Sequence, residues 1–164
     1  MKNKVILGID PGLRNLGLAV LSRSFRILEA EVLSAQAKDP ASKCLKHMTF
    51  ELEKRLERYR PAVVVLEKTW PTRHRSLAQV RRVALRCRRQ AARRRIPVIE
   101  VPVTTVRKVV AGYGWATKME TAQVLAALYP ELQLYLRQSR AWKDRHYQNL
   151  FDAVALALWY RRTH

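Results

Sequence analysis

The chain has 164 residues, 48% of them apolar, and its 32 lysines and arginines outweigh 13 acidic residues to give a net charge of +19. This length suits one domain with its own core, and the apolar content excludes a disordered chain. The two cysteines, Cys44 and Cys87, match no zinc-site spacing, and no apolar run is long enough to span a membrane. We therefore expect a single cytoplasmic domain over residues 1–164, without a leader segment.

The excess positive charge destabilises a compact domain through self-repulsion unless a polyanion screens it. Nucleic acid is the first candidate for that polyanion, and an anionic membrane surface is the second. A basic but inert surface is the third interpretation.

The first part of the chain consists of short apolar segments typical of strands. Residues 4–10 read as a buried strand that ends on Asp10. Residues 16–21 and 25–33 read as two further strands, and the short links between them predict an antiparallel meander.

A helix and a buried strand follow. Asp39-Pro40 resembles an N-cap followed by the first helical residue, and apolar spacings of three and four predict a helix that ends before Pro61. Residues 62–67 are apolar throughout, which is typical of a central strand, and this strand also ends on a carboxylate, Glu67.

An arginine-rich helix is predicted over residues 73–95, with ten arginines and no acid. Its apolar stripe could pack on the sheet or on the same helix of a second subunit; it consists of Leu77, Val80, Ala84, Cys87 and Ala91. The remaining elements are a strand at 98–102, a short helix capped by Thr104 or Thr105, a capping box at 117–120 that opens another helix, a polar loop at 130–145 and a last helix at 146–162. This order predicts an α/β fold in which a five-stranded mixed sheet carries helices on both faces.

Asp10 and Glu67 each end a predicted inner strand, and this is the edge of an α/β sheet where ligands bind. Asp152 lies on the last helix, whose small neighbours Ala153 and Ala155 allow it to approach the sheet closely. Three carboxylates at one place repel one another unless a cation compensates them, and Mg²⁺ prefers such oxygens. Each acid also has a structural interpretation: Asp10 as a turn cap, Glu67 as the partner of an arginine, and Asp152 on a solvated face.

Four segments occur in the order and spacing of the RuvC family of Holliday junction resolvases, and the resemblance covers nearly the whole chain. They are GIDPG, VVVLEKTW, PVIEVPVTTVRKVVAGYGWATK and NLFDAVALAL. The resemblance implies an RNase H-like fold, a homodimer, a four-way DNA junction as substrate, and two Mg²⁺ per active site, with Mn²⁺ as a substitute. It also implies paired nicks that leave 5′-phosphate and 3′-hydroxyl ends.

The resemblance carries over three metal-ligand positions to Asp10, Glu67 and Asp152. The family's fourth position, commonly Asp and sometimes His, holds Asn149 here, three residues before Asp152 and on the same helix face. Asn149 can offer an oxygen but no charge, so one of the two metals is expected to bind more weakly. His146 and Asp144 are alternative ligands.

Further positions of the resemblance concern the DNA. Lys118 and Arg107 match basic positions near the scissile phosphate, where they could act on the reaction or only contact phosphate. Trp70 matches an aromatic position that stacks on opened bases, although a place in the core is also possible. Phosphate contacts are expected from Arg73, Arg75, Arg81, Arg82 and Lys108.

Other functions stay open at this point. Because Asn149 replaces an ionisable ligand, the protein could bind junctions and cut them weakly. It could also cut RNA–DNA hybrids or other branched DNA. An actin-like ATPase, which shares the G-x-D-x-G pattern, needs two such domains, and 164 residues are too few for both.

Overall fold

The computed structural model describes residues 5–71, 74–137 and 141–164, with side chains for all of these except residues 141–145. Its five strands form one sheet in the order β3-β2-β1-β4-β5. They are β1 (Ile6–Asp10), β2 (Asn15–Leu21), β3 (Ile27–Ser34), β4 (Val63–Glu67) and β5 (Val98–Val101). The first three pair antiparallel, whereas β4 runs parallel to both β1 and β5. The predicted mixed sheet with an antiparallel meander is confirmed.

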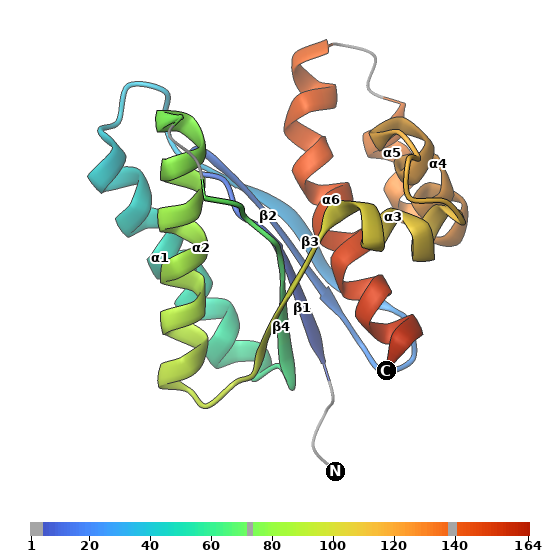
Figure 1. Cartoon of the computed structure of the whole chain (residues 1–164), viewed down its shortest axis with the longest axis horizontal. Coiled ribbons are helices and arrows are strands. Elements are labelled where there is room, and N and C mark those ends of the chain that lie inside the picture. The colour runs from blue at the N-terminus through green and yellow to red at the C-terminus, as the bar shows by residue number, and fades with distance from the viewer. Residues whose placement is uncertain (1–4, 72–73, 138–140) are drawn as a thin grey trace.

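Helices cover both faces of the sheet, as predicted (Figure 1). α1 (Ala41–Tyr59) and α2 (Arg75–Arg93) lie on one face. The other face carries α3 (Val103–Ala111), α4 (Lys118–Leu128), the 3₁₀ turn η1 (Pro130–Leu132), α5 (Gln133–Leu136) and α6 (Ala141–Thr163).

The prediction of a polar loop over residues 130–145 is wrong. This stretch holds η1, α5 and the start of α6. Leu132 is fully buried, and Tyr135 and Leu136 pack against the same core. Apolar contacts with α4 and α6 order residues 130–136, although their own pattern is too short to predict a helix. Residues 138–140 of the predicted loop lie outside the described part of the chain.

Two of the predicted helix caps are also wrong. α1 has Pro40 as its N-cap residue, and the Asp39 carboxylate instead binds the Lys43 ammonium at 2.9 Å. α3 begins at Val103 after Pro102, without a side-chain cap. The capping box of α4 is confirmed, since Thr117 and Glu120 bond each other's backbone N–H groups.

The sheet divides the core in two, and strand alternation assigns each residue to one side. Leu7 and Ile9 of β1 pack with α1 and α2, whereas Ile6 packs with α6. In the same way Val63 and Val65 of β4 face α6. By this alternation Gly8, Asp10 and Glu67 share the face that α6 covers.

α6 lies on the sheet at backbone contact. A Cβ atom added to Gly8 would stand 2.2 Å from the Ala153 carbonyl oxygen, and one added to Gly17 would stand 1.9 Å from that of Asn149. Both distances are far below van der Waals contact, so only glycine fits under this helix. Ala153 on the helix side is fully buried, which agrees with the predicted close approach.

Gly8→Ala is expected to lower the free energy of unfolding by about 1–3 kcal/mol, since the added methyl group forces α6 away from β1. Urea denaturation followed by circular dichroism measures the loss. Gly114→Ala is the control, because the nearest atom to its added Cβ, the Thr104 carbonyl oxygen, is 3.2 Å away. An equal loss in both variants would contradict the assigned role of the contact.

Candidate active site

Three carboxylates come from three elements that meet at one end of the sheet. Asp10 ends β1 and Glu67 ends β4, and these strands are parallel neighbours in which Ile9 pairs with Leu66. The next residues along, Asp10 and Glu67, therefore lie side by side at the carboxyl edge, facing α6. Asp152 of α6 is buried, with 9% of its surface exposed.

The three groups act on one another electrostatically. Burial raises the pKa of Asp10 well above its usual range, and the charges of Asp152 and Glu67 raise it further. A hydrogen bond between Asp10 and Glu67 also raises the pKa of Asp10. Burial likewise raises the pKa of Glu67 and of Asp152, and the charge of Asp152 adds to the effect on Glu67. The site thus holds more negative charge than its surroundings stabilise.

This donor set suits a hard divalent cation, which favours carboxylate oxygens and compensates their repulsion. Within the described part of the chain, no three His, Cys, Asp or Glu side chains gather closely enough to enclose an ion as they stand. The charges of Asp152 and Glu67 nevertheless raise the pKa of Asp10, so the three carboxylates lie near one another.

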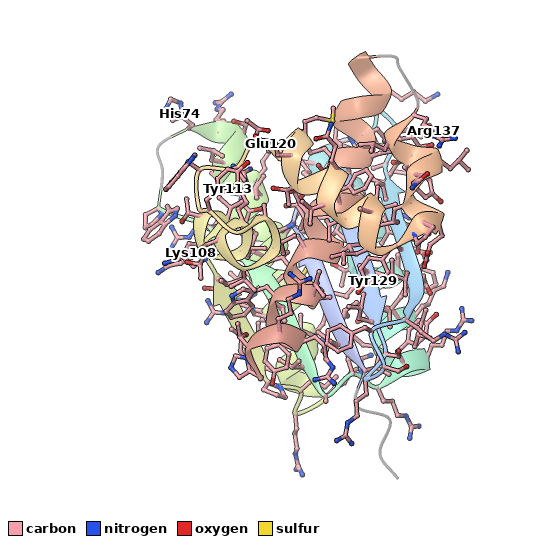
Figure 2. All side chains as sticks on the ribbon, turned by 90° about the vertical axis from the view of Figure 1, so that its right-hand side faces the viewer. His74, Lys108, Tyr113, Glu120, Tyr129 and Arg137 are labelled. Carbon is pink, nitrogen blue, oxygen red and sulfur yellow. The ribbon has the colours of Figure 1, made fainter. Side chains whose placement is uncertain are left out.

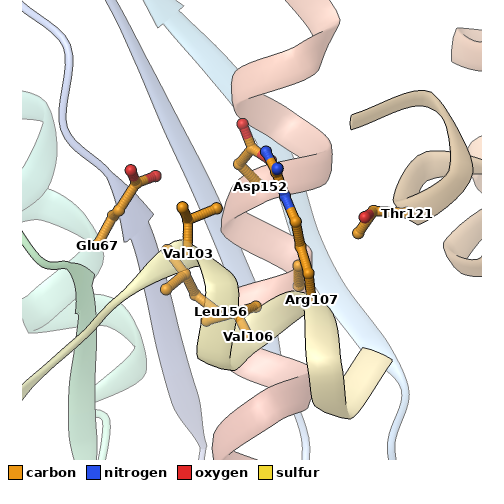
Figure 3. A pocket seen from close by; sticks show the side chains of 8 residues that line it. Glu67, Val103, Val106, Arg107, Thr121, Asp152 and Leu156 are labelled. Atoms are coloured by element: carbon orange, nitrogen blue, oxygen red, sulfur yellow. The ribbon is translucent and has the colours of Figure 1, made fainter. Parts of the chain in front are cut away.

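Two basic side chains approach the acids from α3 and α4. The Lys118 ammonium, at the start of α4, lies 3.5 Å from Asp152 Oδ2. Arg107 of α3 lines a small pocket together with Glu67 and Asp152, and Figure 3 shows its guanidinium beside Asp152. Both positive charges lower the pKa of Asp152 against the effect of burial.

Arg107 has an unused donor. Its Nε is buried and, among the described residues, has no hydrogen-bond partner. A buried donor without an acceptor costs about 1–3 kcal/mol, and more when it is charged. The pocket, about 10 Å³ in volume, has room for about one water molecule beside this donor.

Asn149 is tied to the sheet. Its amide Nδ2 donates to the backbone carbonyl of Asn15 at 2.7 Å, where β2 begins. This bond fixes the turn of α6 that precedes Asp152. The sequence gives no sign of Asn15 as a partner, because the two residues are 134 positions apart.

Of the two alternative metal ligands to Asn149, the structure describes the side chain of His146 only. The His146 ring lies edge-on against the Tyr147 ring, with centroids 5.1 Å apart. The side chain of Asp144 lies outside the described residues.

A second, larger pocket of about 290 Å³ adjoins the carboxylates through Lys118. α4, α5 and α6 form it, and its aromatic walls are Tyr135, Tyr147 and Phe151. The sequence analysis missed this pocket because it placed residues 130–145 in a loop.

The structure also places the predicted DNA contacts. Trp70 is 62% exposed, which excludes the core alternative, and the Lys68 ammonium lies 4.2 Å from its ring centre. Arg75, Arg81 and Arg82 are exposed along α2, and Lys108 is exposed on α3 (Figure 2). Arg73 lies outside the described residues.

The apolar stripe of α2 packs on its own subunit over part of its length. Cys87 and Ala91 enter the core shared with α1, and burial raises the pKa of the Cys87 thiol to about 12. Leu77, at the other end of the stripe, is 51% exposed, and Leu85 is 43% exposed. α2 thus presents apolar side chains to solvent in its first turn and near its middle.

A family model described as "Crossover junction endodeoxyribonuclease RuvC" matches residues 6–159. The chain belongs to the RuvC family.

Individual RuvC proteins agree with this assignment. The chain is 33% identical over 129 residues to the Thermomicrobium roseum enzyme, across 75% of this chain and 77% of the relative. It is 29% identical over 161 residues to that of Rickettsia typhi, across 93% and 94% of the two chains. The structure titled "T. thermophilus RuvC in complex with Holliday junction substrate" superposes with a TM-score of 0.75 at 27% identity, covering 95% of this chain and 92% of that one.

The RuvC assignment agrees with the RNase H-like fold expected from the sequence. Among the described residues, no helix is both long and apolar enough to cross a membrane.

Asp10→Asn is expected to raise the free energy of unfolding of the metal-free protein at pH 7, by about 1–3 kcal/mol. The folded-state pKa of Asp10 is raised, so the folded protein holds a proton that the unfolded chain releases. The wild type therefore loses stability as the pH rises from the ordinary carboxyl range through the raised pKa. The variant lacks the part of this loss that comes from Asp10, so the unfolding free energies of variant and wild type should converge near pH 4.

Urea titrations in EDTA between pH 4 and pH 8 measure this difference. Glu131→Gln, which removes an exposed carboxylate outside the site, is the control. If Asp10→Asn is no more stable than the wild type at pH 7, the burial of an unfavourable charge is contradicted.

Proposed function

We propose that the protein is a divalent-metal-dependent endonuclease that resolves Holliday junctions by paired symmetric nicks. The observation that carries the proposal is the meeting of Asp10, Glu67 and Asp152, all with raised pKa values, beside two basic side chains. Membership of the RuvC family and the likeness to a RuvC structure titled with a junction substrate support the choice of substrate.

Asp10, Glu67 and Asp152 would hold the cations, with Asn149 as a weaker neutral ligand. Two Mg²⁺, or Mn²⁺ as a substitute, would neutralise the phosphate and acidify the attacking water. The carboxylate charges, which repel one another in the absence of a cation, would then be compensated.

The basic residues would act on the scissile phosphate. Arg107 Nε would donate to a non-bridging oxygen and so gain the acceptor that it lacks. Lys118, which is half exposed beside Asp152, would stabilise the charge that develops as the leaving oxygen departs. With the 3′ oxygen as the leaving group, hydrolysis would give 5′-phosphate and 3′-hydroxyl ends, which can be ligated.

The surface charge and exposed side chains favour the binding of a branched polyanion. A net charge of +19 favours DNA, and phosphate contacts would come from Arg73, Arg75, Arg81, Arg82 and Lys108. Trp70 would stack on bases opened at the crossover, since its face is exposed and its neighbour Lys68 adds positive charge.

Paired nicks need two active sites, and we propose a homodimer through α2. Its exposed Leu77 and Leu85 provide apolar surface for a second copy. We expect the protein in the cytoplasm, where its proposed DNA substrate would lie.

One cleavage panel tests the activity. The substrates are a mobile four-way junction, a replication fork, a flap and an RNA–DNA hybrid, each in Mg²⁺ and in Mn²⁺. We expect symmetric, ligatable nicks in the junction alone, no cleavage by Asp10→Asn, and a loss of about 10²–10³-fold in rate for Arg107→Ala. Glu131→Gln should cut like the wild type. Preferential cutting of the hybrid would overturn the proposal in favour of an RNase H-like activity.

A second candidate is a junction-binding protein with weak cleavage, favoured by the engagement of the Asn149 amide with Asn15. In Asn149→Asp a carboxylate would face that carbonyl oxygen. Without metal this variant is expected to lose about 1–3 kcal/mol of unfolding free energy, which Mg²⁺ should restore by binding the folded state.

Thermal melts with EDTA and with Mg²⁺, together with junction cleavage, separate the two candidates. A wild type that binds junctions without cutting them, beside an active Asn149→Asp, would establish the second candidate. A wild type that cuts as fast as Asn149→Asp at every Mg²⁺ concentration would exclude it.

A further inference from the structure

Trp115 is the most exposed large apolar side chain in the described part of the protein, at 83%. It stands in the linker of residues 112–117 between α3 and α4. Leaving an indole ring in water forgoes a large part of the stability that its burial would provide. The exposure is therefore a feature to be explained, and the site described above makes no use of this ring.

The linker holds Trp115 in a defined position. Gly112 ends α3 in the left-handed region, with φ of 93°, and Ala116 is fully buried. The Tyr113 ring lies against the Trp115 ring with centroids 5.5 Å apart. Tyr113 donates its hydroxyl to Glu120 at 2.9 Å, and Glu120 belongs to the capping box of α4. Figure 2 shows Tyr113 and Glu120 side by side.

This arrangement brings Trp115 near the proposed catalytic group, which consists of the three carboxylates and Lys118. It precedes Lys118 by three residues, a stretch of chain that spans at most about 11 Å. Lys118 in turn contacts Asp152. Lys108, exposed on the neighbouring helix α3, adds positive charge on this side of the molecule (Figure 2). An exposed aromatic face among cations is the arrangement that stacks on bases of single-stranded nucleic acid.

We propose that Trp115 is a second stacking platform, which binds an unpaired nucleobase of the strand that passes Lys118. The inference rests on the proposed binding of junction DNA. It differs from the role proposed for Trp70, because Trp70 follows Glu67 on β4, whereas Trp115 is fixed to the helix that carries Lys118. Each ring would hold an opened base near a different member of the catalytic group.

Junction binding in Ca²⁺, measured by fluorescence anisotropy, tests the proposal. Trp115→Ala should weaken junction affinity roughly 5- to 150-fold, as expected for the loss of one stacked base, and Trp115→Phe should recover most of it. Because stacking releases no counterions, the slope of log affinity against log salt should stay at its wild-type value in Trp115→Ala. Phe50→Ala is the matched control, since Phe50 is 59% exposed on α1, which covers the opposite face of the sheet.

A 2-aminopurine placed at successive positions around the cut site locates the base. Its fluorescence should change on binding to the wild type at one position and return toward the free value in Trp115→Ala. Wild-type affinity in Trp115→Ala would overturn the inference and leave the proposed function intact. Failure of the wild type to prefer junctions over linear duplex would instead overturn the proposed function. Loss of dimerisation in Trp115→Ala, measured by sedimentation, would assign the ring to a contact between subunits and also overturn the inference.

Discussion

The contact of α6 with the backbone of β1 and β2 is the constraint on which the candidate site depends. Helices normally rest on a sheet through two layers of side chains, but Gly8 and Gly17 remove one layer. The turn of α6 that carries Asn149 and Asp152 then reaches the strand end that carries Asp10. Any side chain at either glycine would separate the carboxylates, so two residues without functional groups control the geometry of three that have them.

That geometry is unfavourable for the protein alone. Burial raises the pKa values of the three acids, and neighbouring carboxylate charges raise those of Asp10 and Glu67 further. Arg107 meanwhile keeps a buried donor without an acceptor among the described residues. A cation and a phosphate would relieve both conditions together, because the first neutralises the acids and the second accepts from the arginine. Under the proposed function, the site is less stable without a cation and a phosphate, and this instability favours the binding of both.

Exposed aromatic rings and the basic surface extend the site outward. Trp70 and Trp115 are both exposed, and each stands three residues from a charged member of the site, Glu67 or Lys118. Trp70 lies beside Lys68, and Trp115 is supported by Tyr113. Cations attract the strand without regard to sequence, whereas rigid rings act only on bases that have left the stack. The combination is suited to DNA whose pairing is interrupted.

Local patterns in the sequence determined the strand ends at Asp10 and Glu67, the capping box at Thr117 and the fold class, since alternation, helical spacing and capping involve residues close along the chain. Only the tertiary structure decided that β1 and β4 are parallel neighbours, that Asn149 bonds to Asn15, and that Arg107 faces Asp152. It also ordered residues 130–136 as η1 and α5. These features depend on contacts between distant segments, whose partners no local spacing specifies.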